Sequence, residues 1–161
     1  NLISVLDGGL KKWKLENKPL SKEKASIIET NYRASIKKNL VINFNQVEKN
    51  IEKKEFCLVD ARGENRFKGL VEEPRKNLKK GNIKGSKNLP FSKIINSENN
   101  TFKKKAELEK IFINHGINPN EKLAFSCGSG ITACVLGLAN TIINNKLPVI
   151  YDGSWAEYGL K

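Results

Sequence analysis

Cys127 is the residue whose surroundings are best suited to chemistry, because it stands in the stretch CGSGITA between an apolar run and a loop that contains glycine. Residues 122–126 are expected to form a strand, and the nearly all-apolar residues 133–144 a helix. Gly128 and Gly130 let the backbone curl, so that successive N–H groups point inward beside the helix N-terminus. Such a loop favours a thiolate, which predicts a nucleophilic cysteine with a lowered pKa.

The neighbours of Cys127 limit the reaction that the loop can support. A cysteine phosphatase needs an arginine after five intervening residues to clamp the phosphoryl oxygens, and Ala133 occupies that position. The loop is therefore expected to hold a small sulfur anion, such as a cysteine persulfide. The Ser129 and Thr132 hydroxyls are candidate donors to the sulfur or to the substrate, with an ordinary helix N-cap as the alternative role of Thr132. The expected anion cradle consists of Gly128, Ser129, Gly130, Ile131 and Thr132.

The remaining cysteines and the single histidine are assigned to structure. Cys57, in a predicted strand, and Cys134, in a predicted helix, are expected to pack in the core. Three cysteines without CxxC or Cys/His spacing indicate free thiols in a reducing compartment, with no metal and no organic cofactor. His115 is expected to be a surface residue or cap at a helix end. Activation of Cys127 must then rest on loop dipoles and nearby cations.

The net charge of +12 comes from 29 lysines and arginines against 17 acidic residues, and lysine spread along the chain supplies almost all of it. A nucleic-acid binder would gather this excess into an arginine-rich patch. The pattern therefore indicates compositional bias and no nucleic-acid partner. No apolar run reaches the roughly 18 residues of a membrane span, so no membrane partner is expected.

Predicted strands alternate with predicted helices along most of the chain. Strands or extended pieces are expected at 41–44, 56–59, 88–91, 122–126 and 149–151, and helices at 45–52 (capped by Asn45), 103–115 and 133–144. This alternation predicts an α/β fold, a doubly wound parallel sheet with helices on both faces. Asp60 and Asp152, at strand ends, are expected to hold loops by accepting backbone hydrogen bonds.

An internal repeat predicts the domain organisation. An apolar stretch turns through Asp7-Gly8 toward Trp13, and another turns through Asp152-Gly153 toward Tyr158. The spacing matches a domain, so residues 1–20 are expected to be the end of a preceding, similar domain. Residues 21–31 are then a linker, and residues 32–161 the catalytic domain.

Five motifs carry a resemblance to a known family. They are VDAR at 59–62, NRFKG at 65–69, EEPR at 72–75, CGSGITA at 127–133 and YDGSWAEYG at 151–159. Together they resemble the C-terminal catalytic domain of the 3-mercaptopyruvate sulfurtransferases, within the rhodanese superfamily. The opening VLDGGLKKW resembles the end of the non-catalytic N-terminal rhodanese domain in that family. The resemblance implies a rhodanese-like fold and an N-terminal rhodanese domain as the partner of this one.

The resemblance also implies roles. Cys127 would take sulfur from 3-mercaptopyruvate, leave pyruvate, and pass the sulfur to a thiol acceptor such as thioredoxin or to cyanide. Arg66 and Arg75 would bind the carboxylate and carbonyl of this small anionic donor, which suit guanidinium forks. Ser129 would act in a relay whose His and Asp come from the N-terminal domain. For Arg62 we favour a structural role.

Two alternatives remain open. Thiosulfate sulfurtransferases typically carry basic residues after the cysteine, as in CRKG, whereas this loop is neutral, so mercaptopyruvate is favoured over thiosulfate. A non-catalytic binding or regulatory module is the second alternative.

The chain departs from the family pattern at one turn. The family's GHIPG turn reads Gly81-Asn82-Ile83-Lys84-Gly85 here, which predicts a modest change in stability. The expected location of the protein is the cytoplasm or another reducing compartment.

Overall fold

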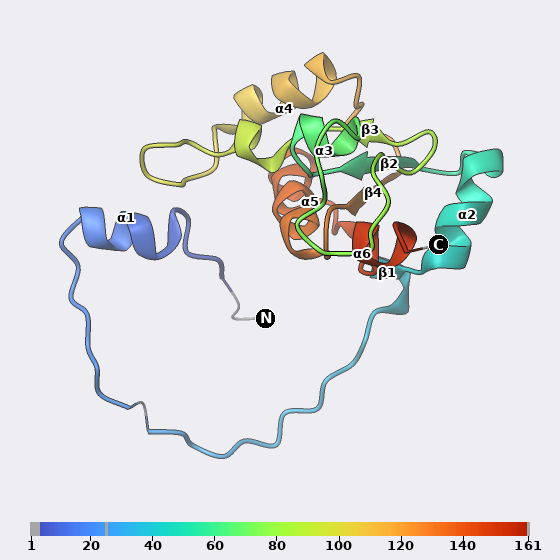
Figure 1. Cartoon of the computed structure of the whole chain (residues 1–161). Coiled ribbons are helices and arrows are strands. Elements are labelled where there is room, and N and C mark those ends of the chain that lie inside the picture. Colours follow the sequence, from blue (N-terminus) through green and yellow to red (C-terminus); the bar gives the residue numbers. More distant parts are fainter. Residues whose placement is uncertain (1–3, 25, 161) are drawn as a thin grey trace.

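A five-stranded parallel sheet forms the centre of the molecule in the computed structural model, which describes residues 4–24 and 26–160 (Figure 1). The strand order is β1-β5-β4-β2-β3. The strands are β1 (Val41–Ile42), β2 (Cys57–Asp60), β3 (Lys87–Asn88), β4 (Leu123–Ser126) and β5 (Val149–Tyr151). The helices are α1 (Gly9–Leu15), α2 (Phe44–Lys53), α3 (Glu64–Phe67), α4 (Lys105–Asn114), α5 (Ile131–Asn144) and α6 (Ser154–Tyr158), with 3-10 turns η1 (Lys38–Leu40) and η2 (Phe91–Ile94).

Alternate residues of the strands face two different apolar clusters. Phe125 of β4 belongs to the cluster that includes Leu108 of α4 and Leu136 of α5. Ala124 belongs to the cluster on the other face, with Val47 of α2. Helices therefore cover both faces of a parallel sheet, and the predicted doubly wound α/β fold is confirmed.

The first βα junction differs from its prediction by two residues. Asn43, not Asn45, caps α2: its side chain accepts the N–H of Gln46, and the Gln46 side chain accepts the N–H of Asn43. This reciprocal capping box satisfies two backbone donors that the helix end leaves free. The expected cap at Asn45 was wrong because Phe44, which continues the apolar run of the strand, is already the first residue of the helix.

The N-terminal segment contacts the loop between η2 and α4. Asp7 accepts the backbone N–H of Phe102 at 2.9 Å, and Lys11 Nζ donates to the Ser97 carbonyl at 2.7 Å. Between α1 and η1 the described residues form no helix or strand, and they make a long open arc in Figure 1. A helix follows Asp7-Gly8 as one follows Asp152-Gly153, whereas residues 1–3 of the predicted domain remnant 1–20 lie outside the described residues. The domain boundaries stay a prediction.

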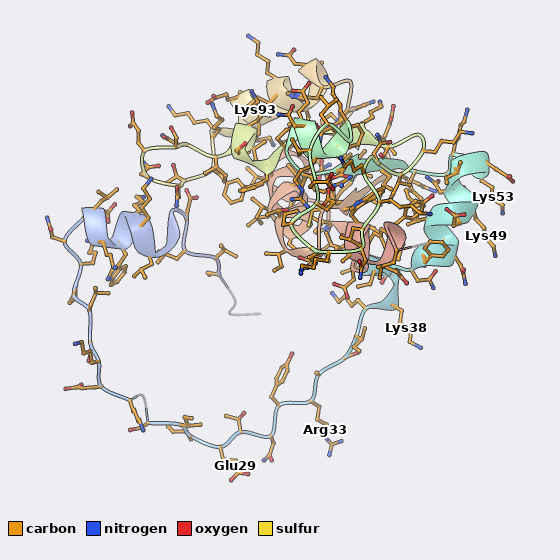
Figure 2. All side chains as sticks on the ribbon, viewed as in Figure 1. Glu29, Arg33, Lys38, Lys49, Lys53 and Lys93 are labelled. Carbon is orange, nitrogen blue, oxygen red and sulfur yellow. The ribbon has the colours of Figure 1, made fainter. Side chains whose placement is uncertain are left out.

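Charged side chains project from several elements. In Figure 2, Lys49 and Lys53 project from α2, Lys38 from η1, and Lys93 from η2, apart from the other three. The labelled cations thus do not converge on one face. Among the described residues, no helix is both long and apolar enough to span a membrane.

Cys134 departs from its prediction, because its side chain is exposed and not packed in the core. On α5, Ala133 and Leu136 are buried and Ala139 follows one turn later, so the core-facing stripe of the helix passes beside position 134. Cys57 is half-buried at the start of β2 and packs against the cluster of Phe125.

Candidate active site

Cys127 lies at the carboxyl end of β4, the central strand of the sheet. Four residues later in the chain α5 begins at Ile131, with Gly130 as its N-cap in the left-handed conformation (φ 81°). A methyl group on Gly130 would come within 3.1 Å of two Asp152 atoms, so both the backbone angle and the space favour glycine. The loop from 127 to 130 is thereby held tightly against the N-terminus of a helix, as the sequence predicted.

The Cys127 thiol is buried (2% exposed) and surrounded by hydrogen-bond donors. The N–H of Ser129 donates to Sγ at 3.4 Å. Burial is the largest single influence on the thiol pKa and would raise it. Hydrogen bonds from the Thr132 hydroxyl and from the N–H groups of Ser129, Ala133 and Thr132 outweigh burial, so the pKa of Cys127 is lowered from its ordinary value.

Within the predicted cradle of residues 128–132, the N–H of Ser129 donates to the sulfur. The N–H groups of Thr132 and Ala133 also favour the thiolate and help to lower its pKa. The N–H of Gly130 is bound elsewhere, to Ser154 Oγ at 3.1 Å. Gly130, and not Thr132, is the N-cap of α5, and the Thr132 hydroxyl is one of the groups that lower the pKa of Cys127.

The turn between β5 and α6 is hydrogen-bonded to the loop that contains Cys127. The N–H of Trp155 donates to the Cys127 carbonyl at 2.9 Å, and the N–H of Ala156 donates to the Gly128 carbonyl at 2.9 Å. Ser154 adds its hydroxyl, which accepts the N–H of Cys127 at 3.0 Å. Sequence reasoning missed Ser154 as a site residue, although the motif YDGSW contains it.

Two arginines face the sulfur loop across a cavity of about 320 Å³. The Arg66 guanidinium lies against Gly128, where a methyl group would be 3.1 Å from Nη2. Arg75 Nη1 donates to the Gly128 carbonyl at 3.3 Å. The cavity is lined by Arg66, Glu73, Pro74, Arg75, Leu78, Cys127, Gly128, Ser129, Ile131 and Thr132. Of the eight predicted site residues, this cavity brings together all except Gly130.

Glu73 orients Arg66, and sequence reasoning missed it despite the EEPR motif. Its carboxylate is 1% exposed and accepts from Arg66 Nη2 at 2.5 Å and from Arg62 Nη1 at 2.8 Å. Arg62 is completely buried, pairs with Asp60 at 2.8 Å, and stacks over the Trp155 ring at 4.4 Å. The structural role favoured for Arg62 agrees with these contacts, because buried pairing leaves its guanidinium no access to the cavity.

The other titratable candidates make structural contacts. His115 is the C-cap residue of α4, and its Nδ1 is 2.9 Å from the Ile111 carbonyl. Asp60 accepts the N–H of Arg62 at 2.9 Å, as predicted for a strand-end aspartate. No group of three or more potential metal ligands occurs among the described residues 4–24 and 26–160.

A parallel α/β sheet that presents a cysteine thiolate in an amide-lined loop, facing two arginines, defines a protein able to carry a small group on sulfur. Comparison with known proteins agrees with this class. The model of the "Rhodanese-like domain" family matches residues 43–161, and the chain therefore belongs to the rhodanese family.

Similar proteins include 3-mercaptopyruvate sulfurtransferases and thiosulfate sulfurtransferases. Human 3-mercaptopyruvate sulfurtransferase is 33% identical over 159 residues, which cover 99% of this chain and 53% of that protein. Rat thiosulfate sulfurtransferase is 33% identical over 157 residues, which cover 97% of this chain and 52% of that protein. The structure of SseA from Escherichia coli, described as a 3-mercaptopyruvate sulfotransferase, superposes with a TM-score of 0.80 at 29% identity and covers 94% of this chain and 56% of that one. The chain thus spans about half the length of the relatives it matches.

Proposed function

We propose that this domain is the sulfur-carrying part of a 3-mercaptopyruvate sulfurtransferase, with Cys127 as the carrier. The observation that carries the proposal is the buried Cys127 thiol, whose pKa is lowered by hydrogen bonds and which lies in one cavity with Arg66 and Arg75. The 33% identity to human 3-mercaptopyruvate sulfurtransferase supports the proposal.

The chemistry follows from these groups. The Cys127 thiolate attacks the donor's sulfur, the carbon–sulfur bond breaks, and its electron pair remains on carbon as an enolate. The proton of the donor's thiol ends on that carbon, so the products are pyruvate and a Cys127 persulfide anion. Arg66 and Arg75 bind the donor's carboxylate and carbonyl oxygens and stabilise the enolate charge. The N–H groups that hold the thiolate then hold the persulfide. Ser129, on the cavity wall, is the candidate to move the proton.

Thiosulfate is the second candidate donor, favoured by the 33% identity to a thiosulfate sulfurtransferase. The same thiolate would take its outer sulfur and release sulfite. The neutral side chain of Ser129 after Gly128 argues for mercaptopyruvate, because a dianion would be better matched by a basic residue at this position.

The partners we propose are a thiol acceptor such as thioredoxin, and a preceding rhodanese domain in the full-length protein. The relatives' additional length supports the second partner. Exposed apolar side chains on and before α1 also support it: Val5, Leu6, Leu10 and Leu15 are each 58–68% exposed. Three free thiols favour a reducing compartment such as the cytoplasm.

The test is intact mass spectrometry after incubation with 3-mercaptopyruvate and, separately, with thiosulfate. We expect the wild type to gain one sulfur atom from mercaptopyruvate and Cys127→Ser to gain none. Cys134→Ser is the matched control, since it removes an exposed thiol from the adjoining helix and should leave the gain unchanged. Gain from thiosulfate alone would favour the second candidate. Gain from neither donor would favour the non-catalytic module.

A further inference from the structure

The Ser154 hydroxyl sits at the centre of the hydrogen bonds that connect the β5–α6 turn to the sulfur loop. It accepts the N–H of Cys127 at 3.0 Å and the N–H of Gly130 at 3.1 Å, and it donates to the Tyr151 carbonyl at 2.8 Å. A hydroxyl has two acceptor sites and one donor, so every site of this one is used. The residue is completely buried.

Ser154 also has a backbone conformation that non-glycine residues seldom adopt (φ 49°). Such a conformation persists only where the surroundings impose it, and it is found most often at functional sites. The preceding residue, Gly153, has no such angle (φ −57°), so the chain adopts the unfavourable conformation at the residue that carries the hydroxyl. The turn thereby directs Ser154 Oγ into the loop.

The distribution of the loop's N–H groups shows what this hydroxyl does. Three amides of the stretch 127–130 have identified acceptors in or beside the loop. Those of Cys127 and Gly130 donate to Ser154, and that of Ser129, which lies between them in the chain, donates to Cys127 Sγ at 3.4 Å. Binding the two flanking amides at Ser154 therefore directs the N–H of Ser129 toward the sulfur.

We propose that Ser154 is a positioning residue that holds the N–H of Ser129 on the Cys127 sulfur by binding the N–H groups of Cys127 and Gly130, which flank Ser129 in the chain. The inference deepens the proposed function, since it names the group that keeps the carrier cysteine reactive. Ser154 is not one of the residues that line the cavity.

Removing the hydroxyl leaves two N–H groups buried without acceptors, because Ser154 is their acceptor in the folded chain. Buried amides do not stay unpaired, so the loop turns them toward other acceptors and no longer holds the N–H of Ser129 on the sulfur. The sulfur then loses this hydrogen bond while it remains buried. Burial, which raises the pKa of Cys127, is no longer outweighed, and the thiolate population at neutral pH falls.

The test is the pH profile of iodoacetamide alkylation at Cys127, resolved from Cys134 by peptide fragmentation, in wild type, Ser154→Ala and Ser154→Gly. Both variants lack the hydroxyl, and glycine also adopts the positive φ without strain, which guards against misfolding of the alanine variant. We expect the alkylation midpoint to rise in both by about one pH unit, which lowers the rate near neutral pH by about tenfold. The KM for 3-mercaptopyruvate should not change, because the arginines are untouched.

Ser126→Ala is the matched control. Ser126 is also a buried serine, directly before Cys127, but its hydroxyl has no hydrogen-bond partner in the part of the chain that the structure describes. The midpoint of Cys127 alkylation in Ser126→Ala should equal that of the wild type. Ser154 variants that are folded, by circular dichroism, and keep the wild-type midpoint would refute the inference. Sulfur uptake by the wild type is measured independently. Failure of the proposed function is therefore distinguishable from failure of the inference about Ser154.

Discussion

Replacing Glu73 by glutamine tests whether the buried ion network positions Arg66. The Glu73 carboxylate is 1% exposed and pairs with two guanidinium groups, at 2.8 Å to Arg62 and 2.5 Å to Arg66. Glutamine keeps the shape and one acceptor oxygen but removes the charge. Breaking a buried pair typically costs about 3–5 kcal/mol, and this cost is reduced here because Arg62 retains Asp60. We expect Glu73→Gln to lower the free energy of unfolding by about 2–4 kcal/mol.

The adjacent glutamate provides a control within the same motif. The side chain of Glu72 is 80% exposed and pairs with the half-exposed Lys80, so Glu72→Gln should cost about 0–1 kcal/mol. The assay is urea denaturation of both variants beside the wild type, followed by circular dichroism. The KM for 3-mercaptopyruvate should rise in Glu73→Gln alone, because Arg66 loses its orienting partner. Equal stability losses in the two variants would refute the reasoning, since burial would then not separate them.

Three further predictions concern the loop and its cavity. Gly130→Ala forces a side chain into a positive-φ position 3.1 Å from Asp152 and should cost about 1–3 kcal/mol in urea denaturation; an unchanged midpoint would mean that the turn is not fixed by this glycine. The folded pKa of Cys127 is lowered, so its thiolate stabilises the fold above the unfolded pKa, and this contribution is lost as pH falls through the folded pKa. The stability of wild type relative to Cys127→Ala should therefore increase with pH between those two values, and a pH-independent difference would contradict the lowered pKa. Arg66→Lys and Arg75→Lys should each raise the KM for 3-mercaptopyruvate about tenfold by removing a planar fork, which steady-state kinetics would measure; an unchanged KM in either would exclude that arginine from donor binding.

The sequence predicted the position of the sulfur loop because local patterns specify it, whereas Arg66 and Arg75 were predicted from the family resemblance. An apolar run, two glycines and an apolar helix determine where Cys127 stands, and the structure places it at the end of the central strand. The fold class follows equally from the alternation of strands and helices. These features depend on neighbours in the chain, which a single sequence displays.

The missed features depend on residues far apart in the chain. Ser154 binds the N–H of Cys127, 27 positions earlier, and no local pattern of a serine after Asp-Gly reveals that contact. Glu73 lies two residues before the predicted Arg75, but its role required the position of Arg62. Cys134 was assigned to the core because its helix is almost entirely apolar, and in such a helix composition does not reveal which face is exposed.

Separate groups stabilise the two charges of the proposed reaction. The main influences that lower the Cys127 pKa are N–H groups and the Thr132 hydroxyl, which are neutral dipoles, while the full positive charges of Arg66 and Arg75 face the space where the donor would bind. A cation paired with the sulfur would stabilise the persulfide strongly and slow its transfer to an acceptor. Glu73 also balances part of the charge on Arg66, which weakens the hold on pyruvate after the carbon–sulfur bond breaks. Neutral hydrogen-bond donors around the sulfur, together with an Arg66 whose charge is partly balanced by Glu73, therefore suit a carrier that must both accept sulfur and release it.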